Sequence, residues 1–404
     1  MDFELTNEHI LIANAARDFA KREIYPGLRE RDEKNNPDYS VLEKMGKNGF
    51  LGVCFPQQYG GQGMDYISLG LVCIEFERVD STARVVLSVH TALNSLTLLQ
   101  WGTEEQKKKY LIPQAKGEKI AGFGLTEPNA GSDVSGIQTT AVLKGDHYVL
   151  NGEKTWISLA DVAHNFLIFA YTDKSKAHKG ISAFIVERNF PGVSTSAIHG
   201  KLGVRAGNTG SISLQDVKVP KENLLGKEGD GFKIAMSAID NGRYTVAAGA
   251  VGIIEACLDT SVKYAHERET FGKEIGKHQL VQQMIAKMVA SKEIGRLLTY
   301  RAGELKNKGE RNTKETSLAK WINCNNAFES ANDALQILGA YGYCNEFDIE
   351  RHFRNARGAI IYEGTREIHT LLQAEYALGY RVDKPLEKKL PAWPFEEDKI
   401  PVRH

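Results

Sequence analysis

The chain lacks the residue patterns of a disulfide scaffold, a metal centre or a membrane span. Its 404 residues include only five cysteines, with no CxxC pair, and its eleven histidines form no HExxH motif. We therefore expect no metal, and five reduced, mostly buried thiols in a cytoplasmic protein. No apolar run reaches the roughly 18 residues of a spanning helix, so no membrane span is predicted.

Net charge is also missing, because 51 acidic residues balance 51 basic ones. Such a chain has no overall field to draw it to nucleic acid or to an anionic membrane. The first residues, MDFELTNEH, contain acids and no apolar stretch, unlike a secretory signal. A chain that is 42% hydrophobic and 25% charged has the ordinary composition of a globular protein, and its length suits two or three domains.

The chain divides into three blocks that differ in the spacing of their apolar residues. Apolar residues recur at helical intervals in the first and third blocks, whereas β-branched and aromatic residues alternate in the middle one. The blocks cover residues 1–119, 120–231 and 232–380, and a Pro- and charge-rich tail covers 381–404. The pattern predicts an α+β protein with an N-terminal α-helical domain, a middle antiparallel β-barrel or sandwich and a C-terminal four-helix-type bundle. The tail is either a mobile extension or a strap on a neighbouring subunit.

Individual elements follow from the same periodicity. The predicted helices cover residues 8–24, 66–77, 83–99, 232–240, 244–267, 279–307, 313–338 and 365–377. The predicted strands cover residues 139–151, 166–171, 181–187 and 211–219, with turns at 144–146 and 151–152.

The string GLTEPNAGSDVSG, residues 124–136, opens the middle block. Its small residues, free N–H groups and hydroxyls allow a backbone to approach a planar ring and a pyrophosphate, although a plain connector has similar composition. The string resembles the first signature of the acyl-CoA dehydrogenase family, which implies that family's fold and an FAD cofactor. The flavin and phosphate contacts that this resemblance implies are Phe123, Leu125, Thr126, Gly131, Ser132, Trp156, Ile157 and Ser158. For Trp156, the alternative is a core tryptophan at a strand end.

A second string, QILGAYGY at residues 336–343, is followed by Glu346, Arg351 and Asn355 and resembles the family's second signature. Ala340 departs from the usual Gly or Ser. The residues that the resemblance assigns to the FAD of a neighbouring subunit are Arg268, Thr270, Phe271, Gln279, Gln336, Gly339 and Ala340. A guanidinium suits a pyrophosphate, although Arg268 alone could also be a solvated helix end. The family implies a homotetramer, a dimer of dimers, that passes electrons to an electron-transferring flavoprotein.

The sequence Tyr362-Glu363-Gly364-Thr365 is the candidate catalytic segment. A carboxylate can remove a weakly acidic proton next to a thioester if burial raises its pKa. By the resemblance, Glu363 is this base and the β-hydrogen leaves as hydride to flavin N5, whereas a surface glutamate before a helix is the structural alternative. Thr365 and Glu367 are further cofactor contacts by resemblance.

Arg84 is a charged residue in an otherwise apolar helix, so it must be paired or serve a ligand. It either forms an ion pair with Glu77 or Asp80, or it binds a carboxylate of the substrate. In this region the chain resembles glutaryl-CoA dehydrogenases, in which residues matching Glu77 and Tyr362 assist decarboxylation. Val85 departs from the usual serine. The implied substrate contacts are Arg84, Ser88, Ser132, Asp240, Arg243, Tyr362 and Gly364.

Several alternatives remain open. Asp240 and Arg243 lie one helical turn apart and form either a CoA contact or an intrahelical ion pair. The acyl group could be a bulkier substituted succinyl thioester, of the benzylsuccinyl type and oxidised without loss of carbon dioxide, or a short-chain fatty acid. Outside these enzymes, the same scaffold could serve as a flavin-binding interaction or assembly module without turnover.

Overall fold

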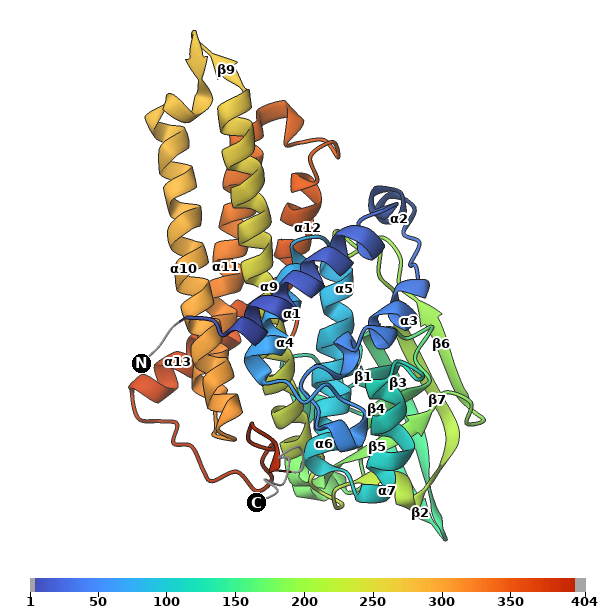
Figure 1. The fold of residues 1–404 in the computed structure, drawn as a ribbon. Coiled ribbons are helices and arrows are strands. Elements are labelled where there is room, and N and C mark those ends of the chain that lie inside the picture. Colours follow the sequence, from blue (N-terminus) through green and yellow to red (C-terminus); the bar gives the residue numbers. More distant parts are fainter. Residues whose placement is uncertain (1–3, 397–404) are drawn as a thin grey trace, which may run out of the picture.

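N-terminal helices, a β sheet and a bundle of long helices lie side by side (Figure 1). The structure is a computed structural model that describes residues 4–396, so residues 397–404 of the predicted tail lie outside the described residues. One hydrophobic core joins the N-terminal helices to the sheet, and a second core fills the bundle. Helix α9 (Gly231–Glu267) contributes Val251 to the first core and Ile254 to the second, so it fixes the bundle against the rest.

The N-terminal region is helical, as predicted. Its helices are α1 (Asn7–Phe19), α2 (Leu28–Lys34), α3 (Ser40–Lys47), α4 (Tyr66–Glu77), α5 (Ser81–Val86), α6 (Leu96–Trp101), α7 (Glu104–Gln106) and α8 (Ile112–Ala115). The predicted helix at 83–99 is confirmed as a helical stretch, but wider π-helical turns at Leu87–Ser95 separate α5 from α6. Nearly every residue of α4 is buried, which explains its lack of a polar face.

The middle region is one mixed sheet. Its strands are β1 (Ala121–Gly124), β2 (Thr140–Lys144), β3 (His147–Ser158), β4 (Asn165–Tyr171), β5 (Ile181–Glu187), β6 (Val193–Ala197), β7 (Thr209–Pro220) and β8 (Leu224–Leu225). The strand order is β6-β7-β3-β2-β4-β5-β8, and β1 pairs with β4 in parallel, so the sheet is not purely antiparallel.

One predicted turn in this sheet is wrong. Asn151 and Gly152 lie inside β3, where the register with β7 shifts at a bulge. Gly152 is needed there because its φ is 152° and a Cβ would lie 2.4 Å from the Thr139 hydroxyl. A glycine inside a strand often marks such a close approach rather than a turn.

The C-terminal region is a bundle, as predicted. Besides α9, its elements are β9 (Glu269–Thr270), β10 (Lys273–Glu274), α10 (Gln279–Asn307), α11 (Thr313–Leu338), α12 (Ile349–Ala359) and α13 (Arg366–Ala377). The predicted break between residues 240 and 244 is wrong, because α9 continues through Gly242 without interruption. Helix α9 is long and apolar enough to cross a membrane, but 78% of its most apolar window is buried inside the protein, as in a core helix.

The described cysteines are all free thiols, four of them buried and Cys344 exposed. Within residues 4–396, no three His, Cys, Asp or Glu side chains gather where they could hold a metal ion. The tail packs against its own chain as far as the structure describes it, with Phe395 buried beside Tyr66.

Candidate active site

Glu363 lies in the turn between α12 and α13, in a backbone conformation that side chains rarely adopt. Its φ is 55° and that of Gly364 is 100°. Such local strain persists only where the surroundings enforce it, and it is common at active sites. The Glu363 Oε2 atom is shielded from solvent and has no hydrogen-bond partner among the described residues. Burial raises the pKa of this carboxyl to about 7, although the nearby cations Arg84, Lys320 and Arg243 act against the rise.

Two cations hold the backbone of this turn. The buried Lys320 on α11 donates from Nζ to the carbonyl of Gly364 at 2.6 Å. Arg243 on α9 donates from Nε to the carbonyl of Glu363 at 3.2 Å. Thr365 then caps α13 by accepting from the Ile368 N–H. Three helices thus position the carboxylate, which is the support that a catalytic side chain requires.

Helix α9 carries a glycine where the carboxylate touches it. A Cβ on Gly242 would lie 2.1 Å from Glu363 Oε2 and 2.8 Å from Leu93 Cδ2. Gly242 is therefore the position that lets the Glu363 side chain lie directly against the helix. The sequence prediction had left residues 241–243 between two helices.

Arg84 is buried with only 1% of its surface exposed, and it forms the centre of a polar cluster. Its Nε pairs with the equally buried Glu77, while Nη1 donates to Ser88 Oγ at 3.0 Å and Nη2 to the Tyr362 hydroxyl at 2.5 Å. The structural alternative of an ion pair is thus present, with Glu77 and not with Asp80. The Glu77 Oε1 atom has no hydrogen-bond partner among residues 4–396.

Asp240 and Arg243 form the intrahelical ion pair, at 3.2 Å. Asp240 also accepts from the hydroxyl of Thr313, at the start of α11, at 2.6 Å. Because Arg243 contacts the Glu363 carbonyl, this pair connects Glu363 with the start of α11.

The loop after β1 brings the first set of predicted flavin contacts together with β3. Phe123 and Leu125 are buried, whereas Gly131 and Ser132 are exposed. The carbonyl of Thr126 accepts from the N–H of Thr155, which ties the loop to β3 next to Trp156.

Trp156 is not a core residue. It is 60% exposed and its φ is 60°, while the neighbouring Ile157 is buried. An exposed indole held in a strained conformation fits a residue that covers a planar ligand better than one that fills a core.

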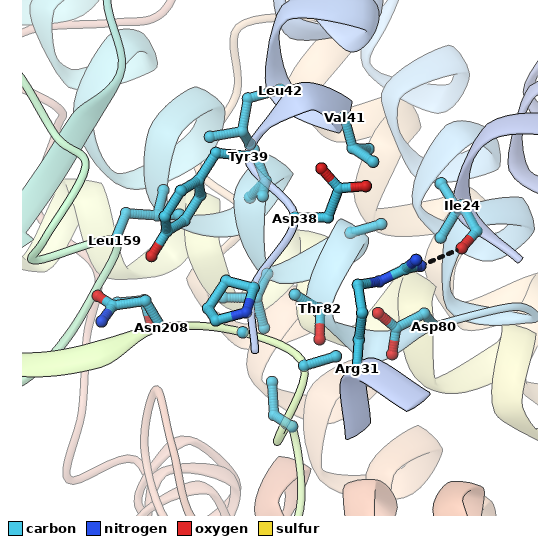
Figure 2. Close-up of a pocket in the computed structure, with 18 of the residues that line it drawn as sticks. Ile24, Arg31, Asp38, Tyr39, Val41, Leu42, Asp80, Thr82, Leu159 and Asn208 are labelled. Atoms are coloured by element: carbon cyan, nitrogen blue, oxygen red, sulfur yellow. Dashed lines mark hydrogen bonds between the residues drawn. The ribbon is translucent and has the colours of Figure 1, made fainter. Parts of the chain in front are cut away.

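Ser158 lines a cavity between the N-terminal helices and the sheet (Figure 2). Tyr39, Leu159 and Asn208 lie along one side of it, and Arg31 donates to the carbonyl of Ile24 on the other. Of the predicted flavin contacts, Ser158 alone is among the lining residues, and no bundle residue is among them.

The second set of predicted cofactor contacts lies far from these loops. The β9–β10 hairpin forms the upper end of the bundle in Figure 1, whereas β1 and β3 lie near its lower end. Phe271 at the hairpin is 95% exposed, with a φ of 51°. The exposed members of the set are Arg268, Phe271, Gln279, Gln336, Gly339 and Ala340, while Thr270 is half-buried. Glu367 is also exposed. One chain thus does not bring the two sets together.

The sequence prediction missed three residues that build the site. Lys320 and Gly242 position Glu363. The sequence features that could have indicated them are a lysine on a helix with few other charges and a glycine inside an apolar helical run. The third is Glu127, which accepts from the backbone of Gln138 and Thr139 and pairs with the fully buried Lys154 at 2.7 Å. This pair closes the loop over residues 127–139.

Family models match almost the whole chain. The N-terminal, middle and C-terminal domains of acyl-CoA dehydrogenase match residues 6–118, 122–217 and 229–378.

Characterised relatives share more than two fifths of the sequence. The chain is 44% identical to the short-chain specific acyl-CoA dehydrogenase of Clostridium acetobutylicum, over 92% of this chain and 98% of the relative. It is 42% identical to the glutaryl-CoA dehydrogenase of Desulfococcus multivorans, over 94% of this chain and 99% of the relative.

Solved structures have the same fold. A chain from a structure described as the electron transferring flavoprotein of Acidaminococcus fermentans has a TM-score of 0.92 at 45% identity, covering 94% of this chain and 100% of that one. A glutaryl-coenzyme A dehydrogenase with glutaryl-CoA has a TM-score of 0.91 at 42% identity, covering 94% and 98%. The chain therefore belongs to the acyl-CoA dehydrogenase family, the FAD-dependent oxidoreductases that act on acyl-CoA thioesters.

Proposed function

We propose that this chain dehydrogenates an acyl-CoA whose acyl group carries a second carboxylate, as glutaryl-CoA does. The observation that carries the proposal is Arg84, a buried guanidinium in the same cluster as Tyr362, the neighbour of the base. A plain fatty acyl chain would have no use for a charge in this position.

The hydrogen bonds of Arg84 leave two of its N–H donors unused. A guanidinium has five N–H donors, and three of them are used by Glu77, Ser88 and Tyr362. Two donors remain, and a fork of this kind binds the paired oxygens of a carboxylate. Glu77 neutralises Arg84 in the absence of substrate, which makes the burial of the arginine tolerable. Its unpartnered Oε1 atom would lie near the acyl carboxylate, where we propose that Glu77 and Tyr362 assist decarboxylation.

The proposed chemistry begins at Glu363. A carboxylate with a pKa near 7 is a suitable base at neutral pH, because half of it is ionised and its proton affinity is high. It removes the α proton, and we assign the Glu363 backbone N–H as a donor to the thioester oxygen, where negative charge develops. FAD, when bound, accepts the β-hydrogen as hydride.

We propose that Trp156, Ser158 and the loop around Ser132 hold the flavin, because these residues expose a ring and hydroxyls beside β3. Phe123, Leu125, Thr126, Gly131, Ile157 and Thr365 are the remaining proposed contacts on the same chain. The exposed set around Arg268, Phe271 and Gln336 lies at the other end of the bundle, so we propose that it reaches the FAD of a second subunit in a homotetramer. Light scattering of the purified chain tests this assembly, and a monomer that retains FAD would contradict it.

The electron acceptor and the limits of the domains are proposals as well. The similarity to a chain in a structure described as an electron transferring flavoprotein supports an acceptor of that class. We place the domain boundaries near residues 119 and 231 and propose a cytoplasmic enzyme.

A short-chain fatty acyl-CoA is the second candidate, and one observation favours it. Arg84 already has a counter-ion in Glu77, so the pocket is electrically balanced before any substrate carboxylate arrives. The 44% identity to a short-chain specific relative agrees with this alternative.

The test mixes FAD-loaded protein anaerobically with glutaryl-CoA or butyryl-CoA and follows the flavin absorbance. An artificial acceptor then permits turnover, and mass spectrometry identifies the thioester products. We expect glutaryl-CoA to bleach the flavin and yield crotonyl-CoA, whereas glutaconyl-CoA would mean oxidation without decarboxylation. Bleaching by butyryl-CoA alone would establish the short-chain alternative, and bleaching by a benzylsuccinyl-type thioester alone would indicate a bulkier acyl group.

Two variants separate the proposed role of Arg84 in substrate recognition from that of Glu363 in proton abstraction. Arg84→Gln should lose glutaryl-CoA oxidation and keep some activity on butyryl-CoA. Glu363→Gln should keep FAD and lose turnover with every thioester, because the α proton then has no acceptor. Unchanged turnover in Glu363→Gln would refute the base assignment, and FAD binding without turnover in the unaltered protein would mean an assembly module.

A further inference from the structure

The segment 381–396 follows the last residue that the family models match. The C-terminal family model ends at residue 378. The relative from Clostridium acetobutylicum is covered over 98% of its length by 92% of this chain, so this chain has residues without counterparts there. The segment, called the strap below, nevertheless makes specific contacts with its own chain.

The far end of the strap is anchored in the seam between the N-terminal helices and the bundle. Phe395 is 1% exposed and meets the ring of Tyr66 edge-on at 6.5 Å. Trp393 donates from its backbone N–H to the carbonyl of Asn307 at 2.7 Å, and from its indole to the carbonyl of Gly63 at 3.0 Å. This end is thus docked, and it fixes where the preceding residues run.

The middle of the strap contacts three other parts of the chain. Arg311, between α10 and α11, donates to the carbonyl of Lys384 at 2.9 Å. Lys233, in the first turn of α9, pairs with Glu387 at 2.5 Å. Gln100 on α6 donates to the carbonyl of Lys388 at 2.9 Å. Figure 1 shows this part of the chain leaving α13 and passing below the lower end of α10.

The contacts at Lys233 and Arg311 lie on either side of Asp240. Asp240 lies seven residues after Lys233 on α9, about 10 Å along the helix. It also accepts from Thr313, which follows Arg311 by two residues. Arg243, one turn further along α9, reaches the backbone of Glu363. The contacts that run from Glu363 through Arg243 to Asp240 on α9 therefore end beside the strap.

We propose that the strap binds the nucleotide end of the CoA thioester, with Lys384, Lys388 and Lys389 as its phosphate contacts. This inference rests on the proposed acyl-CoA substrate. All three lysine side chains are exposed, and none forms an ion pair or hydrogen bond within residues 4–396. Pro385, between the first two lysines, restricts the backbone, and the docked Phe395 limits its movement. Lysine side chains bind phosphate groups as point charges.

The test measures binding, so it does not depend on turnover. FAD-loaded full-length protein is titrated calorimetrically with CoA and with pantetheine, which lacks the nucleotide and its phosphates. The variant Lys384→Gln/Lys388→Gln/Lys389→Gln should bind CoA roughly tenfold more weakly, a difference of about 1.4 kcal/mol. Its binding of pantetheine should not change. The three corresponding Lys→Arg changes should preserve CoA binding, because the charge remains.

The control variant is Lys144→Gln/Lys218→Gln/Lys221→Gln, which removes the same charge from exposed positions on the β domain. It should bind CoA as tightly as the unaltered protein does. This result would show that the weaker binding of the strap-lysine variant does not come from the change in net charge alone. Trp393→Ala should give the same pattern as the strap-lysine variant in weaker form, because it loosens the anchor and leaves the lysines in place.

Three results would overturn the proposal. The first is unchanged CoA binding by the strap-lysine variant. The second is an equal loss of affinity for CoA and for pantetheine in the strap-lysine variant, which would mean that the substitutions disturb the whole binding site. The third is tighter CoA binding by the strap-lysine variant, which would mean that these lysines hinder CoA binding. If the protein binds CoA as expected yet oxidises no thioester, the proposed function fails while the strap proposal holds.

Discussion

The change Gly242→Ala adds one methyl group at the point where helix α9 touches the carboxylate of Glu363, the proposed base. In an exposed helix, replacing glycine by alanine stabilises by about 1 kcal/mol, because alanine has the better helix propensity. Here the new Cβ would lie 2.1 Å from Glu363 Oε2, well inside any real contact. The atom that must move is the end of a flexible side chain, so the fold can accommodate the change while the base cannot stay in place.

The expected loss of reaction rate follows from how far the Glu363 carboxylate must move. Real Cβ contacts are not shorter than about 3.0 Å, so the carboxylate must retreat by roughly 1 Å from its position at 2.1 Å. A misplacement of about 1 Å in a reacting group typically lowers a rate by about 10²-fold. We therefore expect Gly242→Ala to reduce the rate of flavin reduction about 100-fold, with a free energy of unfolding within about 1 kcal/mol of the original.

The assay is anaerobic stopped-flow reduction of the bound flavin by saturating substrate, together with chemical denaturation. The matched control is Gly252→Ala in the same helix, whose Cβ would lie 2.2 Å from the backbone carbonyl of Ile74. Backbone cannot swing aside, so this control should lose about 1–3 kcal/mol of stability and react at the normal rate per folded molecule. Normal flavin reduction by Gly242→Ala would refute the account of how Glu363 is positioned.

Three further predictions concern charge. Because burial raises the pKa of Glu363 to about 7, kcat/KM should climb about tenfold per pH unit below that value and level off above it. The folded state holds this proton more tightly than the unfolded chain, so the free energy of unfolding should fall as pH rises from about 4.5 to about 7. Glu363→Gln should abolish this part of the pH dependence. A kcat/KM that does not change with pH in the unaltered protein would contradict the assignment of Glu363 as the base. Lys320→Met should move the rate midpoint to higher pH, since Lys320 lowers the pKa of Glu363, whereas Lys314→Met at the exposed start of the same helix should not. Glu127→Ala should lower the free energy of unfolding by about 3–5 kcal/mol and release FAD, because it leaves the buried Lys154 without its partner; equal stability by denaturant titration would show that the pair does not close the loop.

Much of the fold follows from periodicity. The long helices and the hydrophobic strands were predictable because burial on one face repeats at 3.6 or 2 residues. A glycine lies at each of two errors of segmentation. Gly152 and Gly242 each stand where another group comes too close for a Cβ, and a single sequence does not distinguish such a contact from a turn.

The site was predictable only in part, for a related reason. Glu363, Arg84 and Trp156 stood out through recognisable strings or an isolated charge. Lys320 and the pair of Glu127 with Lys154 depend on contacts between segments far apart in the chain. Nothing in the local pattern around Lys320 shows that its amine reaches the carbonyl of Gly364, since that contact exists only after α11 packs beside the turn.

Arg84 links the choice of acyl group to the acidity of the base. It is among the cations that lower the pKa of Glu363, even though Glu77 balances its charge. A substrate carboxylate bound at the two remaining donors would add a negative charge beside Arg84 and weaken its stabilisation of ionised Glu363.

The midpoint of the pH dependence of kcat should therefore lie higher with glutaryl-CoA than with butyryl-CoA, because kcat reports the substrate complex. The comparison requires both thioesters at saturation and a rate limited by flavin reduction, measured in single turnovers. In Arg84→Gln, which should retain some activity on butyryl-CoA, the midpoint with that thioester should itself move to higher pH, because a cation that lowers the pKa of Glu363 is gone. A midpoint that is equal or lower with glutaryl-CoA in the unaltered protein would mean that the distal carboxylate does not bind Arg84.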